Sequence, residues 1–192
     1  MIQNTTSRRT FGTSLLAGAL GLVLTQPVCA VASTQQEKLV DEAANRFLTV
    51  IRNGAKREEL AQLLEKYVAT ESIAMFALGK HQRKMRRDER QPYLILFHEM
   101  ILKALEKHGK KVSGKAFVVT GSRGGIVKGY VQHNLDRRTG LEFRTRSGKI
   151  TDIRVQGFWL AITLRQSFDQ LVEGSNGKLE PVFAFLRSDQ TP

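Results

Sequence analysis

The chain has 192 residues, of which 30 are lysine or arginine and 18 are acidic, so its formal net charge is +12. Such a charge favours anionic lipid head groups and acidic proteins as partners. The single cysteine, Cys29, lies in an N-terminal segment that we expect to be removed, which excludes disulfides, thiol catalysis and thiolate metal sites from the mature protein.

The N-terminal segment, residues 1–32, is typical of a bacterial twin-arginine export signal. Arg8 and Arg9 precede an aromatic residue and the apolar run 12–24. This run is shorter than the ~20 apolar residues that cross a bilayer as a helix. The pattern therefore predicts export to the periplasm, and a permanent N-terminal anchor is the alternative.

The end of this segment has the features of a cleavage site. Pro27 interrupts the apolar helix, and Ala30-Val31-Ala32 supplies the small residues that a signal peptidase requires. We expect cleavage near Ala30 or Ala32. The remaining residues, 33–192, are enough for one domain with its own core, and we expect a single domain there.

The first part of the mature chain has helical periodicity. Thr34 and Glu37 fit a capping box, in which each side chain accepts a hydrogen bond from the other residue's backbone amide. Apolar residues then recur every three or four positions from Val40 to Ile51, and Asn53-Gly54 is expected to end this helix. A second helix is predicted over residues 60–68.

Two further helices follow. Residues 73–78 form a third helix that ends at Gly79, and Asp88 is expected to cap a long fourth helix that Gly109 ends. Pro92 lies in its tolerant first turn. The fourth helix carries the broadest apolar face of the chain, made of Tyr93, Phe97, Met100, Ile101, Ala104 and Leu105.

After Gly109 the apolar period changes to two, which is typical of strands. Ser147-Gly148 fits a short hairpin turn, and helical periodicity returns from Phe158 to Gly174 and again over residues 179–186. The sequence thus predicts an α+β domain with an antiparallel four-stranded curved sheet covered by helices. The expected strands are 115–120, 125–133, 140–146 and 149–155.

Motifs of enzymes are scarce. The glycine-rich segment 121–125 lacks the lysine of a phosphate-binding loop and the spacing of a dinucleotide site, so it is better interpreted as a hairpin turn. The four histidines have no metal-ligand spacing, and no carboxylate pair or nucleophile motif is recognisable. We therefore expect a protein that is not an enzyme, with no catalytic residue, metal or cofactor.

The densest basic segment spans residues 80–90. It is either a solvated helical linker or a docking surface for an acidic partner or an anionic membrane. Nucleic-acid binding is disfavoured by the export signal and by the lack of aromatic residues interleaved with basic ones. The residues predicted to dock a partner are Lys80, Arg83, Lys84, Arg86, Arg87 and Arg90.

Several segments resemble the MlaC / toluene-tolerance family of periplasmic phospholipid-binding proteins, among them the long helix over residues 93–97. That family has a helix ending in Leu-Gly, as at Leu78-Gly79, then a strand with an aspartate followed by a glycine turn and a Tyr-Arg-x-x-Phe helix. The matching segments here are 150–153, 155–160 and 164–168. Thr151 and Trp159 replace a tyrosine and a serine of the family pattern, so the chain resembles a divergent member over about residues 38–187.

The resemblance implies an NTF2-like or MlaC-like fold and a function in lipid transport. A monomeric periplasmic carrier would bind phospholipid acyl chains in an apolar cavity. It would shuttle lipid between an inner-membrane ABC transporter complex and an outer-membrane lipoprotein complex, and so maintain outer-membrane lipid asymmetry. Bound lipid would be its only ligand. The alternatives are a hopanoid-associated lipid-binding protein and a non-enzymatic basic adaptor.

Such a cavity requires apolar walls with few buried polar groups. On the long helix the candidates are Phe97, Met100, Ile101 and Leu105, and the alternative for each of them is to fill an ordinary core. The candidates that could face them from the sheet are Phe117, Val119, Phe143, Ile153 and Val155.

Overall fold

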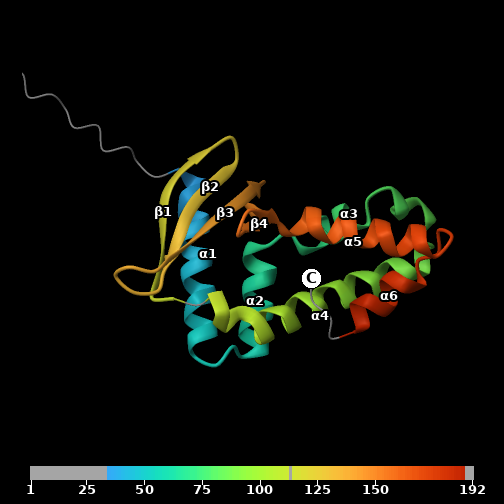
Figure 1. Ribbon diagram of the computed structural model, residues 1–192, viewed down its shortest axis with the longest axis horizontal. Coiled ribbons are helices and arrows are strands. Elements are labelled where there is room, and N and C mark those ends of the chain that lie inside the picture. Colours follow the sequence, from blue (N-terminus) through green and yellow to red (C-terminus); the bar gives the residue numbers. More distant parts are fainter. Residues whose placement is uncertain (1–33, 113, 189–192) are drawn as a thin grey trace, which may run out of the picture. The chain divides into compact units, whose positions relative to one another are not determined.

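The computed structural model describes residues 34–112 and 114–188, which belong to one compact unit (Figure 1). The expected export signal lies outside these residues. Among them, no helix has the length and apolar character needed to cross a membrane. The helices are α1 (Gln35–Arg52), α2 (Arg57–Tyr67), α3 (Thr70–Leu78), the 3₁₀ helix η1 (Gly79–Lys84), α4 (Arg87–Val112), α5 (Leu160–Gly174) and α6 (Glu180–Arg187).

The strands form one antiparallel sheet in the order of the chain, β1-β2-β3-β4-β5. The α+β fold is confirmed, but the described residues form five strands, not four. The fifth strand has only two residues, too few for any period to appear in the sequence. The strands are β1 (Ala116–Arg123), β2 (Ile126–Gln132), β3 (Arg138–Arg146), β4 (Lys149–Val155) and β5 (Phe158–Trp159).

Short turns connect consecutive strands. Ser147 and Gly148 both have positive φ, 50° and 71°, which confirms the hairpin turn predicted between β3 and β4. Gly124-Gly125 joins β1 to β2, so the glycine-rich segment 121–125 is a strand end and a turn. Gln156-Gly157 makes the last hairpin and reverses the chain into β5.

The predicted boundaries hold for α1 but not for α4. Thr34 and Glu37 form the capping box, and Asn53 follows the last residue of α1. Helix α4, by contrast, begins one residue before Asp88 and continues through Gly109. A Cβ atom on Gly109 would lie 3.1 Å from Ile51 Cδ1, so this glycine permits α1 and α4 to approach closely and does not end the helix.

The buried apolar side chains form three clusters. In the first, α1 and Tyr67 of α2 cover the apolar face of the sheet. In the second, α3, α4, α5 and α6 pack against one another, and Figure 1 shows α5 and α6 running beside α3 and α4. The third joins α1, α2 and α4 through Ile51, Leu60, Leu64 and Leu102. The helices therefore separate into a layer on the sheet and a group with its own core.

Candidate functional site

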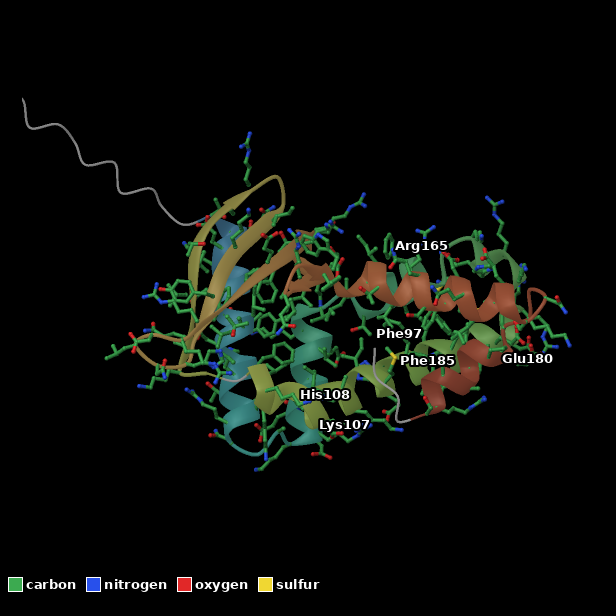
Figure 2. All side chains as sticks on the ribbon, in the orientation of Figure 1. Phe97, Lys107, His108, Arg165, Glu180 and Phe185 are labelled. Atoms are coloured by element: carbon green, nitrogen blue, oxygen red, sulfur yellow. The ribbon has the colours of Figure 1, made fainter. Side chains whose placement is uncertain are left out.

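The predicted walls on the long helix lie in the helical clusters. Phe97 and Met100 are buried among α3, α5 and α6, and Figure 2 shows Phe97 on the side of α4 that faces α5. Ile101 and Leu105 are partly buried, and both pack against the cluster that joins α1, α2 and α4. These four side chains thus contact helices in this structure.

The predicted walls on the sheet lie together in a different cluster. Phe117 and Phe143 are in edge-to-face contact, with ring centroids 5.3 Å apart, beneath α1. Val119, Ile153 and Val155 are partly buried against the same cluster. The structure therefore brings the five sheet residues together but not with those of α4, and contact of all nine with lipid remains a prediction.

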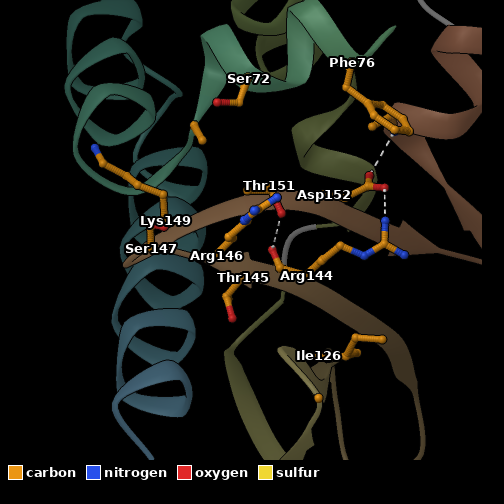
Figure 3. Close-up of a pocket in the computed structure, with 13 residues that line it drawn as sticks. Ser72, Phe76, Ile126, Arg144, Thr145, Arg146, Ser147, Lys149, Thr151 and Asp152 are labelled. Carbon is orange, nitrogen blue, oxygen red and sulfur yellow. Dashed lines mark hydrogen bonds and ion pairs between the residues drawn. The ribbon is translucent and has the colours of Figure 1, made fainter. Parts of the chain in front are cut away.

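A different hollow lies where the sheet meets α3 and α5. Its volume is about 730 Å³, within the range of small-molecule sites. Figure 3 shows Ser72 and Phe76 of α3 on one side and the side chains of β3 and β4 on the other. Its apolar lining includes Ala69, Phe76, Ile126 and Ala161, and its charged lining consists of Arg144, Arg146, Lys149 and Asp152. We call it the junction pocket.

The three cations of the junction pocket differ in their partners. Lys149 Nζ donates to the carbonyl oxygens of Glu65 and Lys66, at 2.5 and 2.8 Å, so its charge compensates the C-terminal end of α2. Arg144 lies 4.3 Å above the ring of Trp159 and 3.5 Å from Asp152. The Arg146 side chain is exposed and has no hydrogen bond or ion pair with a described residue.

The one carboxylate of the pocket is buried and fully engaged. Asp152 Oδ1 accepts hydrogen bonds from the backbone amides of Ile153 and Ala161, both at 2.9 Å. Ala161 lies in the first turn of α5, whose N-cap residue Trp159 supplies no side-chain bond, so Asp152 caps this helix from the neighbouring strand. Burial raises the pKa of Asp152, although the two amides and Arg144 act in the opposite direction.

An apolar edge adjoins these charges. Phe76 is 41% exposed, and the guanidinium of Arg165 lies 5.2 Å from its ring centroid. Leu160, next to the lining residue Ala161, is 40% exposed. Large apolar side chains at this level of exposure beside cations suit an amphipathic ligand better than a purely polar one.

The basic segment spans η1 and the start of α4, after the C-terminal end of α3. Lys80 pairs with Glu173 and Arg90 with Glu71, both at 2.8 Å. Arg86 pairs with Asp88 and Glu89, and Lys84 donates to the carbonyl of Gly177. Within the described part of the chain, Arg83 and Arg87 have no ion pair. Their role in docking stays a prediction.

The described residues contain no group of three histidine, cysteine or acidic side chains that could hold a metal ion. The one buried histidine among them, His81, lies with its Nε2 atom 2.8 Å from Asp169 Oδ1. The junction pocket, with its cations and apolar side chains, can bind an anionic or amphipathic molecule.

The sequence did not identify the junction pocket. The helix predicted over residues 73–78 contains Phe76 and the strand predicted over 140–146 contains Arg144 and Arg146, but neither prediction brings them together. The apolar period of two along this strand predicts that both arginines lie on the face opposite Phe143, and the structure confirms it. Only the packing of α3 and α5 on this end of the sheet makes a pocket of them.

Comparison with known proteins identifies the fold. The phospholipid-binding protein from Ralstonia solanacearum, solved in complex with a phospholipid, superposes with a TM-score of 0.68 at 17% identity, over 81% of this chain and 97% of that one. A search of curated proteins finds no significant match. The family model described as MlaC protein matches residues 34–188. Since this match spans nearly all of the described residues, the chain belongs to the MlaC family.

Proposed function

We propose that this protein is a periplasmic lipid carrier. It binds a phospholipid and shuttles it between membrane complexes as the soluble component of an ABC-type lipid transport system, with an inner-membrane transporter and an outer-membrane lipoprotein complex as its partners. It acts as a monomer, performs no catalytic step and needs no cofactor besides the lipid. Export through the twin-arginine signal of residues 1–32 places it in the periplasm.

The observation that carries this proposal is the match of the MlaC family over residues 34–188, almost the whole described domain. The protein of similar fold from R. solanacearum binds a phospholipid, which supports the same ligand class here. The junction pocket supports it further, because it combines apolar side chains with cations. Burial of acyl chains contributes ~0.8 kcal/mol per methylene, so such a ligand can bind tightly without covalent chemistry.

The test begins with protein purified from the periplasm of the cells that export it. Native mass spectrometry should detect the mature chain with one additional mass in the range of a phospholipid, and organic extraction should identify that lipid. Protein stripped of lipid should take it up from vesicles and transfer a fluorescent phospholipid to acceptor vesicles. The matched control is stripped protein incubated without vesicles.

The outcomes separate the alternatives. A lipid-free protein that cannot be loaded from vesicles, yet still binds an acidic partner, would identify a basic adaptor and contradict the proposal. A bound polycyclic lipid without phosphate would instead indicate the hopanoid-associated function. Transport direction is tested separately, with labelled lipid supplied from one membrane at a time.

A further inference from the structure

The junction pocket contains one cation that the fold itself does not use. Lys149 is bound to the end of α2, and Arg144 is held between Asp152 and Trp159. Arg146 lines the same pocket, and its exposed side chain has no partner among the described residues. A guanidinium that stabilises no contact of the domain is available to a ligand.

Arg144 is a second guanidinium of the junction pocket that can contact a ligand. Its guanidinium is fixed by the ring of Trp159 at 4.3 Å and by Asp152 at 3.5 Å, so little side-chain entropy remains to be lost when it binds a ligand. Both oxygens of Asp152 are engaged, one by two backbone amides and the other by Arg144. With two arginines, one lysine and one carboxylate, the lining carries an excess of positive charge.

The opposite wall carries an exposed aromatic ring. Phe76 and Ser72 of α3 face the strands across the pocket (Figure 3), and Phe76 is 41% exposed. A ligand here meets guanidinium groups on the sheet side and an aromatic ring on the helix side. Guanidinium groups bind phosphate through paired, charge-assisted hydrogen bonds, and an aromatic ring accommodates the apolar stem attached to it.

We propose that the junction pocket binds the phosphate group of a phospholipid through Arg144 and Arg146, with Phe76 against the glycerol and the first methylenes. This site rests on the proposed lipid-carrier function and adds selectivity to it. Acyl chains are buried in the same way whatever head group they carry, so only a polar site can distinguish a phospholipid from a neutral lipid.

The test compares two lipids with identical acyl chains, phosphatidylglycerol and diacylglycerol, which differ in the phosphate head group. Stripped protein is equilibrated with mixed vesicles, and native mass spectrometry gives the ratio of the two bound lipids. Arg146→Gln should lower the preference for phosphatidylglycerol by roughly fivefold, the effect of losing one charge-assisted hydrogen bond at an exposed site. Arg146→Lys should retain part of the preference.

The matched control is Arg137→Gln, an equal loss of charge on the exposed loop between β2 and β3, at the other end of the sheet. It should keep the wild-type ratio. Arg144→Gln should act like Arg146→Gln, with its unfolding midpoint measured because Arg144 also contacts Asp152 and Trp159.

Inorganic phosphate alone distinguishes a lipid head group from a free anion. Its binding is measured by calorimetry on the stripped wild type and on Arg146→Gln. Phosphate binding that depends on Arg146, with an unchanged lipid ratio, would make this a site for free phosphate and overturn the proposal. An unchanged lipid ratio in both arginine variants would also overturn it while leaving the lipid-carrier function intact. Failure of the wild type to bind either lipid would instead contradict the proposed function itself.

Discussion

At the scale of single residues, Asp152 connects the sheet to the helical group. It lies on β4, and its Oδ1 atom accepts a hydrogen bond from the backbone amide of Ala161 in the first turn of α5. The first amides of a helix have no hydrogen-bond acceptor within the helix, and they carry partial positive charge. A carboxylate placed there accepts their hydrogen bonds and compensates that charge. Arg144 compensates the charge of the buried carboxylate from the neighbouring strand.

Replacing Asp152 should therefore measure how much its capping of α5 stabilises the protein. Asp152→Ala leaves the amides of Ile153 and Ala161 without an acceptor and should lower the free energy of unfolding by about 2–3 kcal/mol. Asp152→Asn keeps one acceptor oxygen and should cost less than half as much. Urea unfolding followed by circular dichroism measures both, and equal losses in the two variants would contradict a capping role.

The raised pKa of Asp152 also predicts a pH dependence. Below its usual pKa of 3.8 the carboxyl is protonated in the folded and unfolded states alike. As the pH rises through the raised folded pKa, the unfolded state releases the proton first, so ionisation favours unfolding. The wild type should lose stability relative to Asp152→Asn between pH 3 and neutral pH. A constant difference between the two unfolding free energies would show that the folded environment does not raise this pKa.

At the scale of secondary-structure elements, α4 contributes buried side chains to two hydrophobic clusters. Phe97 and Met100 pack into the group made of α3, α5 and α6, whereas Leu102 packs against α1 and α2. Arg57 of α2 forms ion pairs with Glu99 and Glu106 of α4, which add polar contacts along the same helix. The buried residues of a long helix can thus pack against other helices without facing the sheet.

Met100→Trp tests whether this face also receives lipid. Met100 is only 3% exposed, so the larger ring should overpack the helical core and lower the free energy of unfolding by ~1–3 kcal/mol. Since Met100 is predicted to contact lipid, copurified lipid should also fall, and a destabilised variant that kept its full complement of lipid would contradict that prediction. If lipid were lost while the apo protein kept its melting temperature, acyl chains would enter between α4 and its neighbours in the loaded state.

The basic segment of η1 and α4 supports a second prediction at this scale. Because Lys80, Arg86 and Arg90 are already paired with acidic residues, Arg83 and Arg87 are the positions at which reversal disturbs no ion pair of the described structure. Arg83→Glu with Arg87→Glu should slow association with anionic vesicles or a partner complex roughly tenfold at low salt. The effect should fade at high salt while lipid content is unchanged.

The control for this reversal is Lys38→Glu with Arg137→Glu, which changes the net charge equally at exposed positions on α1 and on the β2–β3 loop. Surface plasmon resonance at several salt concentrations measures both pairs. Equal slowing by the two pairs would mean that net charge, and not this segment, determines association.

At the scale of the whole molecule, the described domain consists of a sheet layer with α1 and a helical group with its own core. Contacts of α3 and α5 with β4 join them, and the junction pocket lies at that boundary. Residues from Ala69 to Ala161 contribute to it, so its shape depends on how the two parts pack. A site at such a boundary can adjust to a ligand through small shifts of whole elements.

Export of the whole chain gives the last prediction. Arg8 and Arg9 lie outside the described residues, and their pairing before an apolar run motivates the twin-arginine assignment. Replacing both by lysine should trap the precursor in the cytoplasm, since this signal requires the arginine pair. Immunoblots of periplasmic and cytoplasmic fractions measure it, and unchanged periplasmic yield would point to export of the unfolded chain by the general secretory route.

The sequence by itself determined the local structure of this protein. The capping box at Thr34, the alternation along β3 and the turn at Ser147-Gly148 were all predictable, because each depends on residues within a few positions of one another. The family was recognisable for a related reason, since its motif around Asp152 spans one strand, one turn and one helix.

Tertiary structure alone decided which residues meet. Phe97 and Phe117 both lie on apolar stripes, yet they pack in different clusters. Gly109 has the sequence character of a helix end but lets α4 approach Ile51. Phe76 and Arg146 line one pocket although 70 positions separate them. The apolar periodicity of a sequence predicts only that a side chain points toward the core. Which side chain it contacts there depends on how the surfaces of elements distant in the sequence fit together.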